Sequence, residues 1–389
     1  MDKYISIVIY LVTFFISASF FELRKRVTSK EKKIVVLISV LIPSLIAGFR
    51  GDTVGTDVMV YVKPLYEGAL RITGFASYMT AFPKIDFGYL CIVYYTTKIF
   101  KEMFAVLFVT ALVTYIPIFY IAEYFEKEKG IKGSTVLLCY YLLFFNLTLN
   151  AVRQSVAISL ILLFFVLVNS NKIIKALVTA VVAQAFHNSA VLGILIVIFS
   201  IFIYRVENQK KRFVYMSFFI LAFATIASNV QNIITFFIQK GLFSEKMNVY
   251  VDIFFGGNSG TKSYMFQMST GMILVLILKI GTLVLPVILG TMYIKDKTFE
   301  MIKMNTIIGI ASYAIMYLIF QSIYVYRITL YGEVFAVLLM SYSGSNIVEN
   351  RKFTVSRRNA IIVGYALVYW YINYAMLGLH QTLPYCLSK

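Results

Sequence analysis

Long apolar runs recur from one end of the chain to the other, and they limit the possible fold more than any other feature. Each run is close to the roughly 20 residues that a helix needs to cross the hydrocarbon core of a membrane. Of the 389 residues, 60% are hydrophobic and 14% are charged, and the mean hydropathy of +0.81 excludes a water-soluble fold. The runs are continuously apolar rather than alternating, so they indicate helices and not barrel strands.

We expect an all-α, polytopic bundle of about twelve spanning helices, forming a single integral membrane domain over residues 1–389. The expected spans are 4–22, 34–49, 103–125, 134–149, 152–169, 173–186, 189–204, 213–230, 270–293, 303–322, 328–343 and 359–378. A shorter apolar stretch, 86–100, is interrupted by Tyr, Thr and Lys. It is either a thirteenth span or an extracytoplasmic helix that lies on or re-enters the membrane.

The basic residues decide the expected orientation. Most Lys and Arg fall in the connections 24–33, 126–133, 170–172, 205–212, 294–302 and 344–358. With twelve spans these connections share one side, which the positive-inside rule makes the cytoplasm. Both termini and the loops 50–102 and 231–269 then lie outside a bacterial cytoplasmic membrane. A thirteenth span at 86–100 would cancel this charge bias, so we favour twelve.

Charge and cysteine usage exclude several classes of function. The net charge of +18 would suggest nucleic acid for a soluble protein, but here it serves membrane topology, so we predict no nucleic-acid partner. Cys91, Cys139 and Cys386 have no metal-ligand spacing and form no disulfide framework. No phosphate-binding loop, dinucleotide fingerprint or Ser-His-Asp pattern is present. We therefore expect a chemistry without metal or cofactor.

The segment 48–61 combines spaced glycines with charged residues and Tyr61 at the end of an expected span. Glycine permits backbone turns that other residues avoid. One interpretation is an ordinary solvated loop. The other is a site, in which Tyr61 contacts substrate and Asp57 serves as a base, since burial raises a carboxylate pKa toward the working pH.

Asn150, Arg153 and Gln154 have a spacing that places them on one face of a helix. They lie at the expected outer start of the span 152–169, where free N–H groups and the helix dipole favour an anion. The planar fork of an arginine suits phosphate oxygens. The alternative is an interfacial arginine that reaches toward water, but the flanking amides favour a substrate-binding site.

Two further candidates lie at expected outer helix starts. His187 is one of two histidines, and it is either a functional residue, as a proton carrier or a phosphate contact, or a polar cap for the following helix. Arg327 follows two tyrosines that suit an aromatic belt, and we favour a binding role for it because ionisable groups at membrane depth tend to line a cavity. Lys279 lies midway through a span and either lines a cleft or faces a bundle partner. Glu333 is that partner or an orienter of Arg327.

These residues converge on one kind of substrate. Arginines, a histidine and one or two carboxylates around an outer cavity suit a large anionic lipid head group, and sugars linked to polyprenyl diphosphate meet that description. The segment 48–61, the elements Asn150-x-x-Arg153-Gln154 and Phe186-His187-Asn188-Ser189, and Tyr326-Arg327 together resemble the EpsG family of Wzy-like polymerases. The resemblance extends from about Gly48 to Glu333.

The resemblance implies a GT-C-type membrane glycosyltransferase of exopolysaccharide or capsule synthesis. It would join oligosaccharide repeat units on undecaprenyl diphosphate outside the cytoplasmic membrane, with Arg50, Arg153 and Arg327 on the donor diphosphate and Asp57 or His187 taking the acceptor proton. Partners would be donor and acceptor lipids and other polysaccharide-assembly proteins. The second outer loop, 231–269, has few charges, unlike a regular pair of polymerase loops.

Other classes stay open. A flippase or transporter would also need a basic cavity, but its polar groups should lie at the midplane in paired halves, and the chain shows no internal repeat. A membrane acyltransferase would place a histidine near the cytosolic face, whereas His187 maps to the other face. A scaffold subunit of cell-envelope assembly would not need the arginines.

Overall fold

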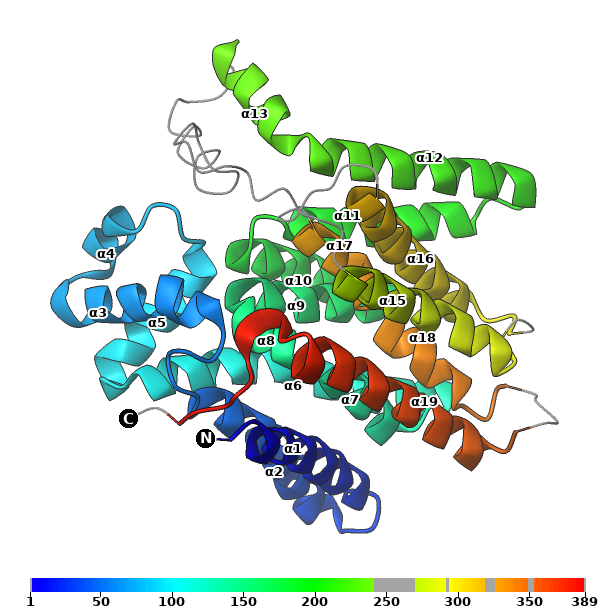
Figure 1. Ribbon diagram of the computed structural model, residues 1–389, viewed down its shortest axis with the longest axis horizontal. Coiled ribbons are helices and arrows are strands. Elements are labelled where there is room, and N and C mark those ends of the chain that lie inside the picture. Colours follow the sequence, from blue (N-terminus) through cyan, green and yellow to red (C-terminus); the bar gives the residue numbers. More distant parts are fainter. Residues whose placement is uncertain (1, 241–269, 292–293, 319–325, 349–352, 388–389) are drawn as a thin grey trace. The chain divides into compact units, whose positions relative to one another are not determined.

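The chain forms helices throughout the part that the computed structural model describes, which is all residues except 1, 241–269, 292–293, 319–325, 349–352 and 388–389. Within those residues no β-strand occurs, and one isolated bridge joins Arg50 to Leu387. The elements are α1 (Lys3–Leu23), α2 (Ser29–Gly48), the π-helix η1 (Val58–Val62), α3 (Lys63–Arg71), α4 (Phe75–Ala81), α5 (Phe87–Phe100), α6 (Met103–Lys129), α7 (Gly133–Tyr140), the π-helix η2 (Tyr141–Phe145), α8 (Asn146–Asn150), α9 (Val152–Asn169), α10 (Ile173–Phe186), α11 (Ala190–Tyr204), α12 (Gln209–Ser228), α13 (Val230–Gln239), α15 (Thr270–Ile288), α16 (Lys297–Leu318), α17 (Tyr326–Glu333), α18 (Ala336–Ser343), α19 (Val355–Trp370), the π-helix η4 (Tyr371–Met376) and the 3₁₀-helix η5 (Leu379–Gln381) (Figure 1).

Within the described residues, each of the twelve expected spans is mostly helical, and residues 292–293 and 319–322 of two of these spans lie outside the described residues. The span 134–149 is built from α7, η2 and α8 in succession, and 328–343 is divided between α17 and α18. Six described helical segments are long and apolar enough to cross a membrane: Lys3–Leu23, Met103–Lys129, Gly133–Asn150, Val152–Asn169, Gly271–Ile288 and Lys297–Leu318. The chain is therefore a multi-pass, all-helical membrane protein, while the number of twelve crossings stays a prediction.

The ambiguous stretch 86–100 forms α5, which has 14 residues. At 1.5 Å per residue this helix reaches about 21 Å, short of the roughly 30 Å hydrocarbon core. Phe87, Tyr95 and Ile99 are each more than half exposed, and their spacing puts them on one face. Helix α5 packs with α3 and α4 in one group (Figure 1) and also against α6 and α10, and its expected place at the membrane surface stays a prediction.

The chain divides into two compact units. Unit 1 comprises residues 1–194, 284–295 and 337–389, and unit 2 comprises 195–283 and 296–336. In unit 1, α2 and α6 pack along each other, as do α1 and α2, and α9 with α6 and α10. The single membrane domain expected from the sequence stays a prediction.

Aromatic side chains fill the core of unit 1 where α1, η2 and α19 meet. The Phe14 and Phe145 rings lie 4.9 Å apart, and Phe14 stacks on Tyr141 at 5.4 Å. The buried Trp370 donates from Nε1 to Asn146 Oδ1 at 2.6 Å. A buried indole N–H needs such a partner because no water reaches it.

Unit 2 contains Lys279, the charged residue that the sequence places midway through a span, and this residue forms an ion pair. Lys279 Nζ contacts Glu333 Oε2 and lies 4.3 Å from the centre of the Tyr313 ring. A Cβ on Gly309 would come within 2.5 Å of the Gly332 carbonyl carbon, so α16 and α17 touch backbone to backbone. Of the two interpretations of Lys279, the structure shows the bundle partner, and that partner is Glu333.

Candidate active site

Several helix ends meet at one end of unit 1. The end of α2 packs against the start of α6, where the Phe49 and Phe104 rings are 4.2 Å apart. Helix α8 ends at Asn150, and α9 begins at Val152 after a break at Ala151 with φ −82° and ψ 60°. The predicted residues Arg50, Asn150 and Arg153 stand directly at these ends.

Glycine lets the segment after α2 pass close to this break. Gly55 has φ +87°, and a Cβ there would lie 2.4 Å from the Leu149 carbonyl oxygen. Its N–H donates to the Gln381 carbonyl at 3.0 Å, and the Gly51 N–H donates to the Cys386 carbonyl at 2.7 Å. The glycine-rich segment is therefore held between α8 and the C-terminal tail.

Asn150 connects these parts. Its Oδ1 accepts from the Thr56 hydroxyl at 2.8 Å and from the Asp57 N–H at 3.2 Å. The amide nitrogen therefore faces the other way, 3.3 Å from His380 Nδ1. Asn150 is 5% exposed, so in this structure it positions the segment that carries Asp57.

Arg153 is the most accessible arginine of this group in unit 1. Its Nη1 donates to Asp86 Oδ2 at 2.8 Å, and its guanidinium carbon lies 5.1 Å from the centre of the Tyr61 ring. The side chain of Arg153 is 12% exposed, against 2% for the residue Arg50. We call Arg153, Asp86, Tyr61 and Asn188 the Arg153 cluster.

The break between α8 and α9 means that Asn150, Arg153 and Gln154 do not lie on one face of a single helix, as the spacing predicted. Asn150 and Arg153 belong to different helices, so the spacing of a continuous helix does not relate them. Gln154 is 3% exposed and lies in the core of the bundle, whereas Arg153 is partly exposed. The structure brings the Tyr61 ring alongside the Arg153 guanidinium.

Arg50 is buried and held by carbonyl oxygens. It donates from Nη1 to the Ala47 carbonyl and from Nη2 to the Leu149 carbonyl at 3.3 Å. Within the described part of the chain, its buried Nε has no hydrogen-bond partner. Burial lowers the pKa of Arg50, and its charge acts from beneath the surface rather than as an exposed fork.

The buried Tyr89 shows that the charges of this end converge. Burial raises the pKa of its phenol, the charges of Arg153 and Arg50 lower it, and the charge of Asp57 raises it. These three predicted site residues therefore lie close enough to one phenol to act on it electrostatically.

His187 and Arg327 are placed differently. Nδ1 of His187 accepts from the Ser189 hydroxyl at 2.6 Å and from the Ser189 N–H at 3.3 Å, just before α11 begins. This is the geometry of a polar cap, one of the two interpretations of His187. Arg327 is partly exposed on α17 and belongs to unit 2, so the three predicted arginines are not one set within a single unit.

The EpsG family model matches residues 33–387, which include the whole Arg153 cluster. The chain belongs to the EpsG family. Members of this family are Wzy-like polymerases. The chain is therefore a membrane polymerase related to exopolysaccharide synthesis, and its substrates are lipid-linked saccharides. Comparisons with curated proteins and with solved structures found no match.

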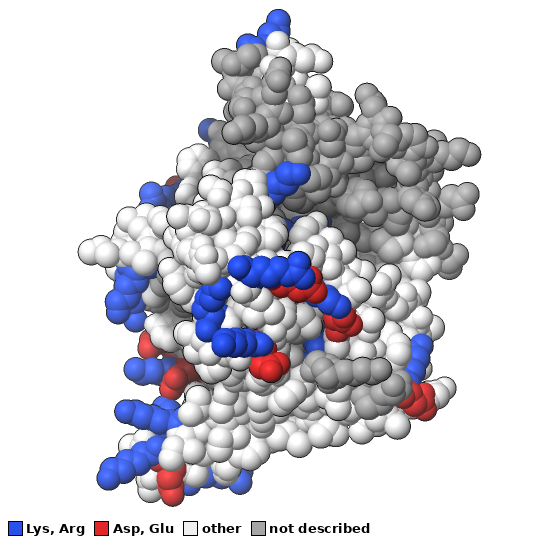
Figure 2. Space-filling model, turned by 90° about the vertical axis from the view of Figure 1, so that its left-hand side faces the viewer, with Lys and Arg blue, Asp and Glu red and all other residues white. Residues whose placement is uncertain are grey.

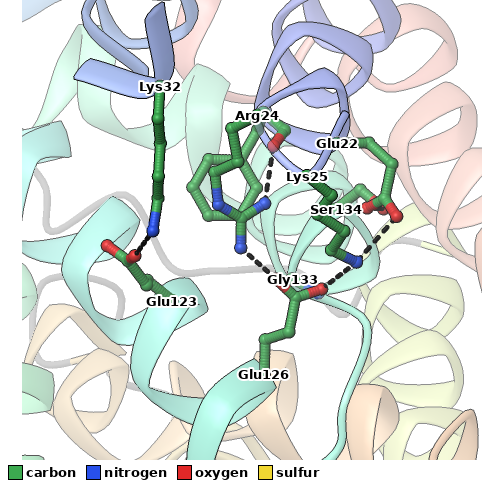
Figure 3. A network of polar contacts seen from close by, with 9 residues as sticks. Glu22, Arg24, Lys25, Lys32, Glu123, Glu126, Gly133 and Ser134 are labelled. Carbon is green, nitrogen blue, oxygen red and sulfur yellow. Dashed lines mark hydrogen bonds and ion pairs between the residues drawn. The ribbon is translucent and has the colours of Figure 1, made fainter. Parts of the chain in front are cut away.

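In this EpsG-family chain a second charged group lies at the opposite end of unit 1 (Figure 3). Glu126 of α6 accepts from Arg24 and pairs with Lys25, which also contacts Glu22 at 2.7 Å. The Gly133 N–H donates to Glu126 at 3.1 Å. We call these residues the Glu126 network. Along α6, Glu126 lies about 35 Å from Met103, the residue at the end where Phe49 packs on Phe104.

Three partners of the candidate residues were not predicted from the sequence. Asp86, Asn188 and His380 all lie in the cluster or beside it. Asp86 carried a signal, since it is the one acidic residue at the start of the stretch 86–100. His380 carried none, because only the fold returns the C-terminal tail to α8.

Proposed function

We propose that this EpsG-family protein joins oligosaccharide repeat units carried on undecaprenyl diphosphate at the outer face of the bacterial cytoplasmic membrane. The observation that carries the proposal is the Arg153 guanidinium, partly exposed at the start of α9 and set against the Tyr61 ring. A planar guanidinium can donate two parallel hydrogen bonds to phosphate oxygens, and a neighbouring ring limits its rotation.

The substrate roles follow from exposure. Arg153 would bind the donor diphosphate directly and neutralise the charge that develops as it leaves. The buried Arg50 would add positive potential from beneath, and Asn150 would hold the segment of Asp57 and Tyr61 in place. Arg327 of unit 2 stays a separate candidate for contact with the diphosphate.

The surface around α3–α5 supports an anionic lipid substrate. Figure 2 views the side on which these helices lie in Figure 1 and shows Lys and Arg spread over it, with fewer Asp and Glu. Arg71, Lys84 and Lys101 are exposed there. A basic surface raises the local concentration of an anionic head group.

Deletion of the gene followed by analysis of lipid-linked saccharides tests the function. Loss of a polymerase leaves single repeat units accumulating on the lipid at the outer face. Units trapped facing the cytosol would instead identify a flippase. Unchanged full-length polymer would contradict both.

Cysteine labelling from outside intact cells tests the orientation, with both termini outside. Positions in 50–80 should react, and positions in 205–212 should not. The expected outer positions 245–262 lie outside the described residues. The reverse pattern would place the Arg153 cluster in the cytosol and exclude the proposed reaction.

A further inference from the structure

Asp86 lies where three segments of unit 1 meet. It immediately precedes α5, its Oδ2 accepts from Arg153 of α9 at 2.8 Å, and its Oδ1 accepts from the Asn188 N–H at 3.2 Å. A Cβ on Gly88 would lie 2.9 Å from the Ala185 carbonyl oxygen, so the first turn of α5 rests directly on the end of α10. The carboxylate is therefore held in one position.

The surroundings of Asp86 favour a proton acceptor. Its side chain is 6% exposed. Burial raises its pKa above the ordinary value, although Arg153 lowers it and the Asn188 N–H does so too. If a diphosphate binds Arg153 in place of Asp86, Arg153 lowers the pKa of Asp86 much less, and the carboxylate becomes more basic. Donor binding would then prepare the base.

The two bases expected from the sequence fit less well. Nδ1 of His187, the ring nitrogen that could take a proton, already accepts hydrogen bonds from the Ser189 N–H and hydroxyl. The other nitrogen, Nε2, carries the proton of the neutral ring and can donate but not accept. The charges of Asp57 and Arg153 both influence the phenol of Tyr89. The carboxylate that is paired with Arg153, however, is that of Asp86.

We propose that Asp86 is the catalytic base of chain extension, an inference that rests on the proposed polymerase function. The acceptor hydroxyl oxygen forms a bond to the anomeric carbon of the donor, and the bond from that carbon to the diphosphate oxygen breaks. Its electron pair leaves with the diphosphate, which Arg153 binds. The hydroxyl proton passes to Asp86 Oδ2 and is later released to water.

Arg153 changes partners in this reaction. In the structure it holds Asp86, and with donor bound it holds the diphosphate, while the Tyr61 ring keeps the guanidinium in place. The Asn188 N–H retains the other carboxylate oxygen. Oδ2 thereby becomes available beside the leaving group only when a donor is present.

Asp86→Asn in the full chain, purified and reconstituted in liposomes with lipid-linked repeat units, tests this role. The amide keeps an oxygen that accepts from Asn188 or Arg153, so the KM for donor should stay within about threefold. It cannot take a proton, so kcat should fall by about 10²–10⁴-fold. The matched control is Glu123→Gln, which removes the charge of a carboxylate paired with Lys32 at 2.8 Å and should leave kcat unchanged.

Chemical rescue separates a base from a structural ligand. Formate added to Asp86→Ala should restore turnover in proportion to its concentration, whereas formate should not alter the Glu123→Ala variant. A normal kcat in Asp86→Asn, or a loss confined to KM, would overturn the role of Asp86 and leave the polymerase intact. A wild-type protein that extends no chains would overturn the proposed function itself.

Discussion

The two ends of unit 1 hold their arginines in different ways. In the Glu126 network, Arg24 is 4% exposed and shares its carboxylate with Lys25, so each charge is satisfied within the protein. In the Arg153 cluster, the guanidinium contacts one carboxylate oxygen that no second cation of the described residues shares, and an aromatic ring limits its rotation. A second anion can replace that single partner without rebuilding the site. The comparison separates charges that stabilise the fold from charges that are available to a ligand.

The largest expected effect is the loss of Arg153. Arg153→Ala should reduce chain extension by about 10²–10³-fold, because a donor aimed at the leaving diphosphate is removed. Assays of polymer length and protein level in membranes measure it. Arg153→Lys should also lower activity by about tenfold or more, since an ammonium cannot reproduce the fork. Full-length polymer from Arg153→Ala would contradict the role of the Arg153 cluster in substrate binding.

Glu126→Gln should act on stability instead. It leaves the buried Arg24 without its carboxylate, which costs about 3 kcal/mol, while the Phe21 carbonyl and ring still contact the guanidinium. Thermal unfolding in detergent should show a lowered midpoint, with activity per folded molecule close to wild type. A selective loss of activity at normal stability would mean that this end also takes part in the reaction.

Gly55→Ala should damage the Arg153 cluster through the backbone. A left-handed conformation costs an ordinary residue about 1–2 kcal/mol, and the added Cβ would also collide with the Leu149 carbonyl. Chain extension should fall by about tenfold. Gly130→Ala is the matched control, because Gly130 has φ +60° with nothing within 4 Å. Equal effects of the two variants would show that the contact with Leu149 has no role.

The smallest effect should come from Lys32→Ala. This lysine contacts Glu123 at 2.8 Å, and both side chains are more than 40% exposed. Exposed pairs contribute about 0.2–1 kcal/mol, so stability should barely change and activity should not. A large loss in either assay would show that the exposed edge of the Glu126 end matters more than its buried pair.

The sequence by itself determined the helices and the places where they end. Apolar length is a local property, so the described part of each expected span is mostly helical, and polar residues such as Arg50 and Arg153 stand at helix ends. Membership of the EpsG family was also readable from short motifs in their order along the chain.

Only the tertiary structure decided which polar groups meet. Asp86 and Arg153 are 67 positions apart, and Asn150 and His380 are 230 apart. Helical periodicity describes one helix, and it carries no information about which ends of other helices lie beside it. The partners of Arg153, the burial of Arg50 and the pairing of Lys279 with Glu333 follow from packing, because a buried charge must find its partner on a neighbouring segment.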